Sequence, residues 1–261
     1  MQGKILILAL FLFYWVFTPL SAQPGRESEE APSEEDILKV NEYLEEGLVL
    51  MRQGKFEEAI EVLEKGEEMN IEPLVFSYEI AHANYQLGNY KEAIDRLAVL
   101  KDNPDAMEQI YQLLGNSFRH LKQFENAKKA YTEGLEKFPR SGRLYMELGI
   151  TEYALENAKQ AADYWEFGIE AEPAFAKNYY HIAKFYADTP EKLWTVIYGE
   201  ICINLTADDE RLLEMKRLVM NTYKNSLWLA KDGRADFTAI MIKTKNKKDR
   251  MPFAMAFEEI M

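Results

Sequence analysis

The sequence has almost no cysteine, since Cys202 is the only one among 261 residues. A single thiol excludes any internal disulfide. Because Cys202 stands among Ile201, Ile203 and Leu205, we expect a buried, unreactive side chain rather than a nucleophile.

Residues that support catalysis or metal binding are also scarce. The three histidines, His82, His120 and His181, lie far apart in the sequence, and there is no His-Glu-x-x-His pair and no cysteine cluster. A glycine-rich phosphate loop and a nucleophile elbow are missing as well. The glutamate pairs at 57–58 and 67–68 are expected on solvated helix faces. These observations predict a non-enzymatic protein with no metal and no cofactor.

Positive charge is in the minority. The chain has 31 basic and 44 acidic residues and a net charge of −13. Such a balance argues against nucleic acid and against anionic membrane surfaces as partners, because both repel an acidic protein.

Long apolar runs are lacking except at the N-terminus, where Lys4 precedes an unbroken run over residues 5–17. This run is shorter than the roughly 20 residues of a membrane span. Small residues follow up to Ala22, so we expect a signal peptide over 1–22, cut after Ala22. The alternative is an uncleaved segment that anchors the protein in a membrane. Residues 23–36 are acidic and polar, which is typical of a disordered linker.

Export without disulfides is typical of a bacterial periplasm or outer surface rather than of a eukaryotic secretory route. The sequence therefore predicts a periplasmic or secreted protein.

A pattern of aromatic, small and leucine residues recurs with a spacing of 149 − 115 = 34 residues. Its members are Tyr111, Leu114, Gly115, Ala127, Tyr131 and Pro139, which recur as Tyr145, Leu148, Gly149, Ala161, Trp165 and Pro173. The same spacing upstream finds Ala81, Leu87, Gly88, Ala93 and Leu97. Glycine within a helix indicates close approach of a neighbouring helix, because a larger side chain would overpack the contact.

This pattern resembles the tetratricopeptide repeat, a helix–turn–helix unit that stacks into a solenoid. The resemblance implies an all-α protein, a right-handed α-solenoid of about five repeats with a C-terminal capping helix. The repeat domain is expected over 37–205, with repeats at 40–73, 74–107, 108–141, 142–175 and a degenerate fifth at 176–205. Residues 206–233 are expected to form the capping helix, or alternatively a sixth, divergent repeat.

Residues 234–261 differ from the repeats, because a basic run at 243–250 lies between two apolar segments. We expect this tail to fold back on the solenoid. The alternative is an element that docks on a partner or a membrane surface.

The resemblance also implies that the first helices of successive repeats line a concave groove that binds a protein or peptide. The residues it places there, and that we select as candidate binding residues, are Tyr78, His82, Tyr85, Asn116, Arg119, Arg143, Tyr153, Lys177, Tyr180 and Lys184.

The groove positions contain five cations, because Arg52 joins Arg119, Arg143, Lys177 and Lys184, but one acid, Asp188. This excess predicts a partner segment that carries a carboxylate. Grooves of this family that clamp the C-terminal tails of chaperones use a fuller basic set than this chain offers. Asn116 and Arg143 match that set, but Glu147 stands where a further arginine is expected.

The function predicted from the sequence is therefore a non-enzymatic scaffold in the cell envelope that holds a partner segment in its groove. The alternative is a structural protein that associates with itself through the solenoid end or the tail.

Overall fold

The computed structural model describes residues 32–207, 209–226, 228–229 and 235–236. Nearly all of this part is helical. The helices are α1 (Glu34–Arg52), α2 (Phe56–Glu67), α3 (Pro73–Leu87), α4 (Tyr90–Leu100), α5 (Glu108–His120), α6 (Phe124–Lys137), α7 (Gly142–Ala154), α8 (Ala158–Ala171), α9 (Ala176–Ala187), α10 (Lys192–Leu205) and α11 (Asp209–Ser226). A short antiparallel pairing of β1 (Trp228–Leu229) with β2 (Ala235–Asp236) follows.

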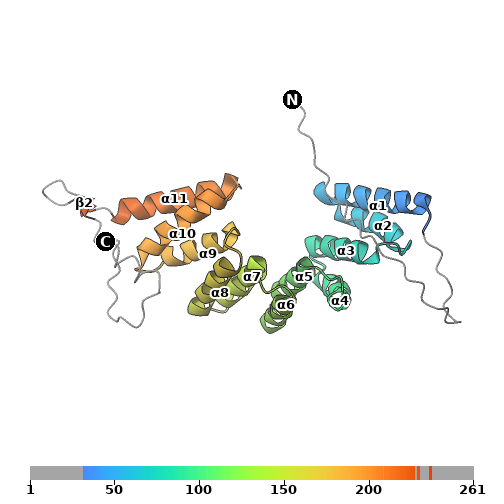
Figure 1. Cartoon of the computed structure of the whole chain (residues 1–261), viewed down its shortest axis with the longest axis horizontal. Coiled ribbons are helices and arrows are strands. Elements are labelled where there is room, and N and C mark those ends of the chain that lie inside the picture. The colour runs from blue at the N-terminus through green and yellow to red at the C-terminus, as the bar shows by residue number, and fades with distance from the viewer. Residues whose placement is uncertain (1–31, 208, 227, 230–234, 237–261) are drawn as a thin grey trace, which may run out of the picture.

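Consecutive helices pack in pairs, α1 with α2 through α9 with α10, and α11 packs on α10. The pairs follow an arch, with α4, α6 and α8 on its outer side (Figure 1). The first helices of neighbouring pairs also touch one another along the arch. This arrangement confirms the predicted α-solenoid of helix–turn–helix repeats with a capping helix.

Close approach of the two helices in a repeat explains the recurring glycines. A Cβ atom at Gly115 would lie 2.2 Å from the ring of Tyr131, and one at Gly149 would lie 2.2 Å from Nε1 of Trp165. The alanines at the equivalent positions of the second helices, among them Ala127 and Ala161, are fully buried. The 34-residue pattern therefore records which side chains meet between paired helices.

The turns inside the repeats share one backbone feature at the same spacing. Gly54 and Gly88 have φ values of +74° and +83°, and Lys122 and Glu156 adopt the same left-handed conformation at +58° and +63°. The next equivalent position is Pro190, whose ring fixes φ near about −65° and excludes this turn. The fifth repeat departs from the others at this point, as the sequence predicts.

Two predicted boundaries differ from the structure. Helix α1 begins at Glu34, inside the expected linker 23–36, because Ser33 and Asp36 form a capping box, with the Asp36 amide 3.1 Å from Ser33 Oγ. Helix α11 ends at Ser226 rather than at Gly233, and Trp228 and Leu229 belong to β1 instead. The expected signal peptide 1–22, the linker up to residue 31 and most of the tail 234–261 lie outside the described residues.

Cys202 is 1% exposed and packs with Met215 and Val219 of α11, which confirms the predicted buried thiol. Burial raises the pKa of this thiol, so it is protonated at neutral pH.

Glu67, which the sequence places on a solvated helix face, makes contacts between helices instead. Its carboxylate accepts hydrogen bonds from Ser77 and from Arg96 Nη1, the latter at 3.0 Å. Glu67 thus links α2 to α3 and α4.

Candidate partner-binding groove

The inner side of the arch brings together side chains of neighbouring first helices. Tyr85 Oη of α3 lies 2.9 Å from His120 Nε2 of α5. Gln112 Nε2 of α5 donates to Glu147 of α7 at 2.8 Å. Both pairs are separated by 35 residues, about one repeat. The predicted groove positions of successive repeats therefore lie side by side.

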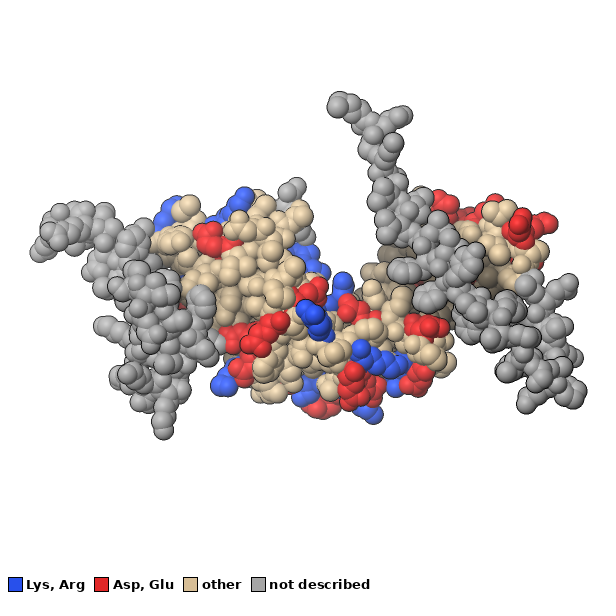
Figure 2. All heavy atoms as spheres, viewed as in Figure 1, with Lys and Arg blue, Asp and Glu red and all other residues tan. Residues whose placement is uncertain are grey.

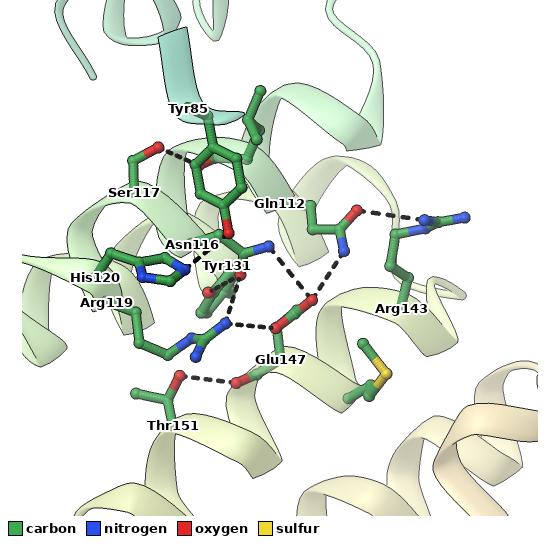
Figure 3. Close-up of polar contacts among 12 residues, drawn as sticks. Tyr85, Gln112, Asn116, Ser117, Arg119, His120, Tyr131, Arg143, Glu147 and Thr151 are labelled. Carbon is green, nitrogen blue, oxygen red and sulfur yellow. Dashed lines mark hydrogen bonds and ion pairs between the residues drawn. The ribbon is translucent and has the colours of Figure 1, made fainter. Parts of the chain in front are cut away.

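The middle of the groove is a polar network around Glu147, which is only 4% exposed (Figure 3). Its carboxylate points from α7 toward α5 and accepts hydrogen bonds from Gln112 at 2.8 Å and Asn116 at 3.5 Å. Arg119 Nη2 lies 3.6 Å from the other carboxylate oxygen. One acid of the fourth repeat thus holds three polar side chains of the third.

The network extends to both sides of Arg119. Asn116 Oδ1 accepts hydrogen bonds from Tyr131 Oη at 2.7 Å and from Arg119 Nη2 at 3.4 Å. His120 stacks on Tyr90 with 4.6 Å between ring centroids. Burial and the charge of Arg119 lower the pKa of His120, so its ring is neutral at pH 7.

Three of the predicted groove cations, Arg119, Arg143 and Lys184, are paired with acids of the same chain. Arg143 Nε lies 3.1 Å from Glu108 Oε1, and Lys184 Nζ lies 2.8 Å from Glu214 Oε1. The sequence-based count of five cations and one acid omits Glu108, Glu147 and Glu214, which lie on the same surface. Figure 2 shows basic and acidic atoms side by side around the middle of the arch, with no continuous positive surface on that face of the described residues. The positive excess is smaller than the sequence predicts.

A pocket of about 570 Å³ lies at the C-terminal end of the groove, lined by residues of α7, α8, α9 and α11. Trp165 of α8 and His181 of α9 stack on each other, with ring centroids 5.5 Å apart and planes 18° apart. Tyr153 of α7 is 51% exposed, and its ring lies 6.0 Å from that of Trp165. Phe185 adds another aromatic wall.

The lining of this pocket combines apolar and aromatic side chains with a few polar ones. Burial, followed by the charges of Lys184 and Arg211, lowers the pKa of His181 to about 4. The ring is therefore uncharged at pH 7 and acts as an aromatic surface. Lys184, Asp188, Glu214 and Asn221 contribute polar groups to the lining. Such a pocket suits an apolar or aromatic side chain held by a few polar contacts.

The structure distributes the predicted binding residues among several environments. Asn116, Arg119, Arg143 and Tyr85 take part in the central network, and Tyr153 and Lys184 line the pocket.

The other predicted residues have neighbours of their own. Tyr180 Oη donates to Glu214 at 2.5 Å. His82 contacts Glu79 and Gln86, and Lys177 Nζ lies 6.0 Å from the centroid of the Phe175 ring. Tyr78 packs partly buried against the core, and this burial raises its pKa to about 12.

Sequence reasoning missed Glu147, Trp165, His181 and Glu214 as groove residues. Glu147 carried a signal, because it stands where clamping grooves have a basic residue. Trp165 is assigned to the core, because it fits the repeating core pattern; it is 3% exposed, yet it also lines the pocket. Glu214 lies on the capping helix, outside the repeats from which the groove was predicted.

Metal-binding clusters and membrane-spanning helices are both absent from the described part of the chain. It contains no group of three or more His, Cys, Asp or Glu side chains placed to hold a metal ion. None of the helices at 32–207 and 209–226 is both long and apolar enough to cross a bilayer.

Comparisons with known proteins agree with this architecture. The family model for anaphase-promoting complex, cyclosome, subunit 3 matches residues 29–100, and a tetratricopeptide repeat model matches residues 113–167. No curated protein matches the chain in sequence.

Several solved structures share the fold. PilF of Pseudomonas aeruginosa has a TM-score of 0.59 at 14% identity, over 87% of this chain and 100% of that chain. The thermophilic TPR protein TTC0263 of Thermus thermophilus has a TM-score of 0.56 at 15% identity, over 71% and 99%. MamA of Desulfovibrio magneticus RS-1 has a TM-score of 0.50 at 17% identity, over 69% and 96%. At these identities the likeness concerns the fold alone.

Proposed function

Because the chain is a tetratricopeptide-repeat protein and hence a protein-interaction scaffold, we propose that it binds an extended partner segment along its groove, anchored by an apolar or aromatic side chain in the pocket. The observation that carries this proposal is the pocket itself, where the half-exposed Tyr153 borders the Trp165–His181 stack. Proteins of this fold are generally non-enzymatic, and binding rather than catalysis is the activity proposed.

Apolar anchoring explains the groove better than capture of a carboxylate. A partner carboxylate at Arg119 would compete with Glu147, and one at Arg143 would compete with Glu108. In the pocket, by contrast, an incoming apolar side chain replaces water on Tyr153 and covers the edge of Trp165. Burying apolar area of this kind stabilises a complex by roughly 25 cal/mol per Å² before the costs of association.

The central network supplies orientation to the bound segment. Arg119 Nε and Glu147 Oε2 are buried without a hydrogen-bond partner among the described residues. The network is therefore incompletely satisfied, and a polar group of the partner contacts it through the exposed His120 rather than through these buried atoms.

Photo-crosslinking in cells tests the proposal. A photo-reactive residue at Tyr153 is expected to give a discrete protein adduct, identified by mass spectrometry. The matched control is Val99, which is 74% exposed on α4 at the outer side of the arch. Equal adducts from both positions, or none from Tyr153, would contradict binding in the groove.

The proposed location is the cell envelope or the exterior of the cell. The support is the apolar run at 5–17 followed by small residues up to Ala22. Fractionation and N-terminal sequencing test it, with export and a new terminus at Gln23 expected. An exported chain that keeps residues 1–22 would instead indicate a membrane anchor, and a full-length chain in the cytosol would contradict export.

A second candidate function, self-association, is favoured by apolar side chains exposed at both ends of the arch. Leu38 on α1 is 65% exposed, and Leu213 and Met220 on α11 are 50% and 54% exposed. Light scattering over a dilution series separates the two functions. A monomer at every concentration contradicts self-association, and a mass that rises with concentration supports it.

A further inference from the structure

We propose that the pocket at the C-terminal end of the groove binds the chain's own tail, through a phenylalanine of residues 251–257. This inference rests on the proposed function, because it names a segment that fills the same pocket. The tail then competes with any other segment for the groove.

The first argument is position. Glu214, Leu218 and Asn221 of α11 line the pocket, and α11 ends at Ser226. Asn221 and Ser226 are five residues apart in one helix, about 8 Å along its axis. Because Asp236 of β2 pairs with Trp228, two residues after the end of α11, the tail continues from near a helix that lines the pocket.

The second argument is reach. The interval from Asp236 to Phe253 is 253 − 236 = 17 residues, which spans up to about 55 Å when extended. Because the segment is tethered, its effective concentration at the pocket is on the order of millimolar, so contacts with an intrinsic Kd below that value keep the pocket occupied.

The third argument is side-chain chemistry. Residues 251–257 read Met-Pro-Phe-Ala-Met-Ala-Phe, with two aromatic and two thioether side chains in seven positions. The pocket presents the rings of Trp165, His181, Tyr153 and Phe185. Aromatic rings pack edge-to-face or offset on such walls, and methionine sulfur makes favourable contacts with ring edges.

The fourth argument is charge. The run 243–250, immediately before the apolar motif, carries five cations and one acid, Asp249. Its charge of +4 leaves the rest of the chain at −13 − 4 = −17. In the pocket lining, Asp188 forms no ion pair with any described residue. The acidic remainder of the chain attracts this basic run, and Asp188 of the pocket lining gives it a carboxylate to contact.

Crosslinking in the purified full-length chain tests the inference. A photo-reactive residue at Tyr153 is used in a mixture of isotopically light and heavy copies. The expected major adduct is a peptide containing residues 251–257 from the same copy. The double substitution Phe253→Ser and Phe257→Ser should reduce this adduct at least tenfold. The control substitution Phe237→Ser, in the same tail but outside the motif, should leave it unchanged.

The other outcomes are decisive as well. Adducts that join light and heavy copies would overturn docking within one chain. Absence of a tail adduct from the purified chain, together with a discrete partner adduct in cells, would overturn this inference and leave the proposed function standing. Absence of any adduct from Tyr153 in both settings would overturn both.

Discussion

At the scale of single residues, the turn within each of the first four repeats requires one residue with a positive φ, at positions 54, 88, 122 and 156. Gly54 and Gly88 adopt positive φ without steric cost, whereas Lys122 and Glu156 adopt it with a Cβ atom. Left-handed backbone costs a non-glycine residue about 1–2 kcal/mol. Glycine avoids this strain, but it loses more conformational entropy on folding, which offsets part of the gain.

We therefore expect Lys122→Gly and Glu156→Gly each to stabilise the protein by about 1 kcal/mol, which raises Tm by about 2–4 °C for a chain of this size. The side chains of both residues are largely solvent-accessible, so little else is lost. Thermal unfolding followed by circular dichroism measures the effect. Gly88→Ala is the matched reverse change and should lower Tm; stabilisation by that variant would show that the turn does not constrain φ.

A second residue-scale feature is the buried acid Glu152, where the repeat pattern would place an aromatic. It is 1% exposed, lies 3.2 Å from Lys128 Nζ of α6, and accepts a hydrogen bond from Asn157 at 2.7 Å. Removal of the cation leaves a buried carboxylate without a countercharge.

Lys128→Met should accordingly destabilise the protein by about 3 kcal/mol. Combining it with Glu152→Leu should restore most of the loss, because an apolar pair of similar volume avoids the cost of burying charge. Urea titrations of the two variants provide the comparison. Equal stability of the single and double variants would mean that Glu152 does not depend on Lys128.

At the scale of helices, an acid between α8 and α10 makes their packing sensitive to pH. Burial raises the pKa of Glu166 to about 7, with Tyr198 Oη donating to its carboxylate at 3.2 Å. In the unfolded chain the same group titrates near 4.5. Between these two values the folded state binds more protons than the unfolded state, so stability falls as pH rises from about 4.5 to 7.

Glu166→Gln should remove this contribution and flatten the dependence of Tm on pH between about 5 and 8, with the largest gain over the parent at the upper end of that range. Differential scanning calorimetry across that range checks the prediction. A parallel shift of the two curves, with the slope unchanged, would assign the pH dependence to another group.

The helix order was predictable from the sequence because the signals are local and repeated. Glycine opposite Tyr131 and Trp165 marks the third and fourth helix pairs, and the 34-residue spacing locates the others. The ends were less predictable. Ser33 caps α1 through a contact three residues away, and α11 ends at Ser226 although apolar periodicity continues to Trp228.

The groove was predictable as a surface but not as a charge distribution. Position within the repeat places Arg119 and Arg143 on the inner side, yet their countercharges come from different repeats. Glu147, which pairs with Arg119, is on the next first helix, and Glu108, which pairs with Arg143, is on the preceding one. Contacts between repeats depend on how the units stack, which the pattern within one repeat does not encode. The pocket depends on four helices and was not visible in any one of them.

At the scale of the whole molecule, each helix pair contacts its neighbours along the arch rather than a single common core. The buried clusters follow this order: one joins the first three helices, a larger one spans α3 to α7, and two belong to α7 through α11. In such a linear array, stability is close to a sum over repeats and their interfaces. Damage at one end should then stay near that end.

Met215→Asp tests this expectation, because Met215 is fully buried where α11 covers α9 and α10. A charge placed there should detach the capping helix and raise amide hydrogen exchange in α9 and α10 at least tenfold, while α1 to α4 keep their protection. Hydrogen exchange read by mass spectrometry resolves the two ends. Met220→Asp is the matched control, since Met220 is 54% exposed on the same helix and should change little. Equal loss of protection from α1 to α10 would instead show one cooperative unit, in which the cap stabilises the whole arch rather than its last repeat.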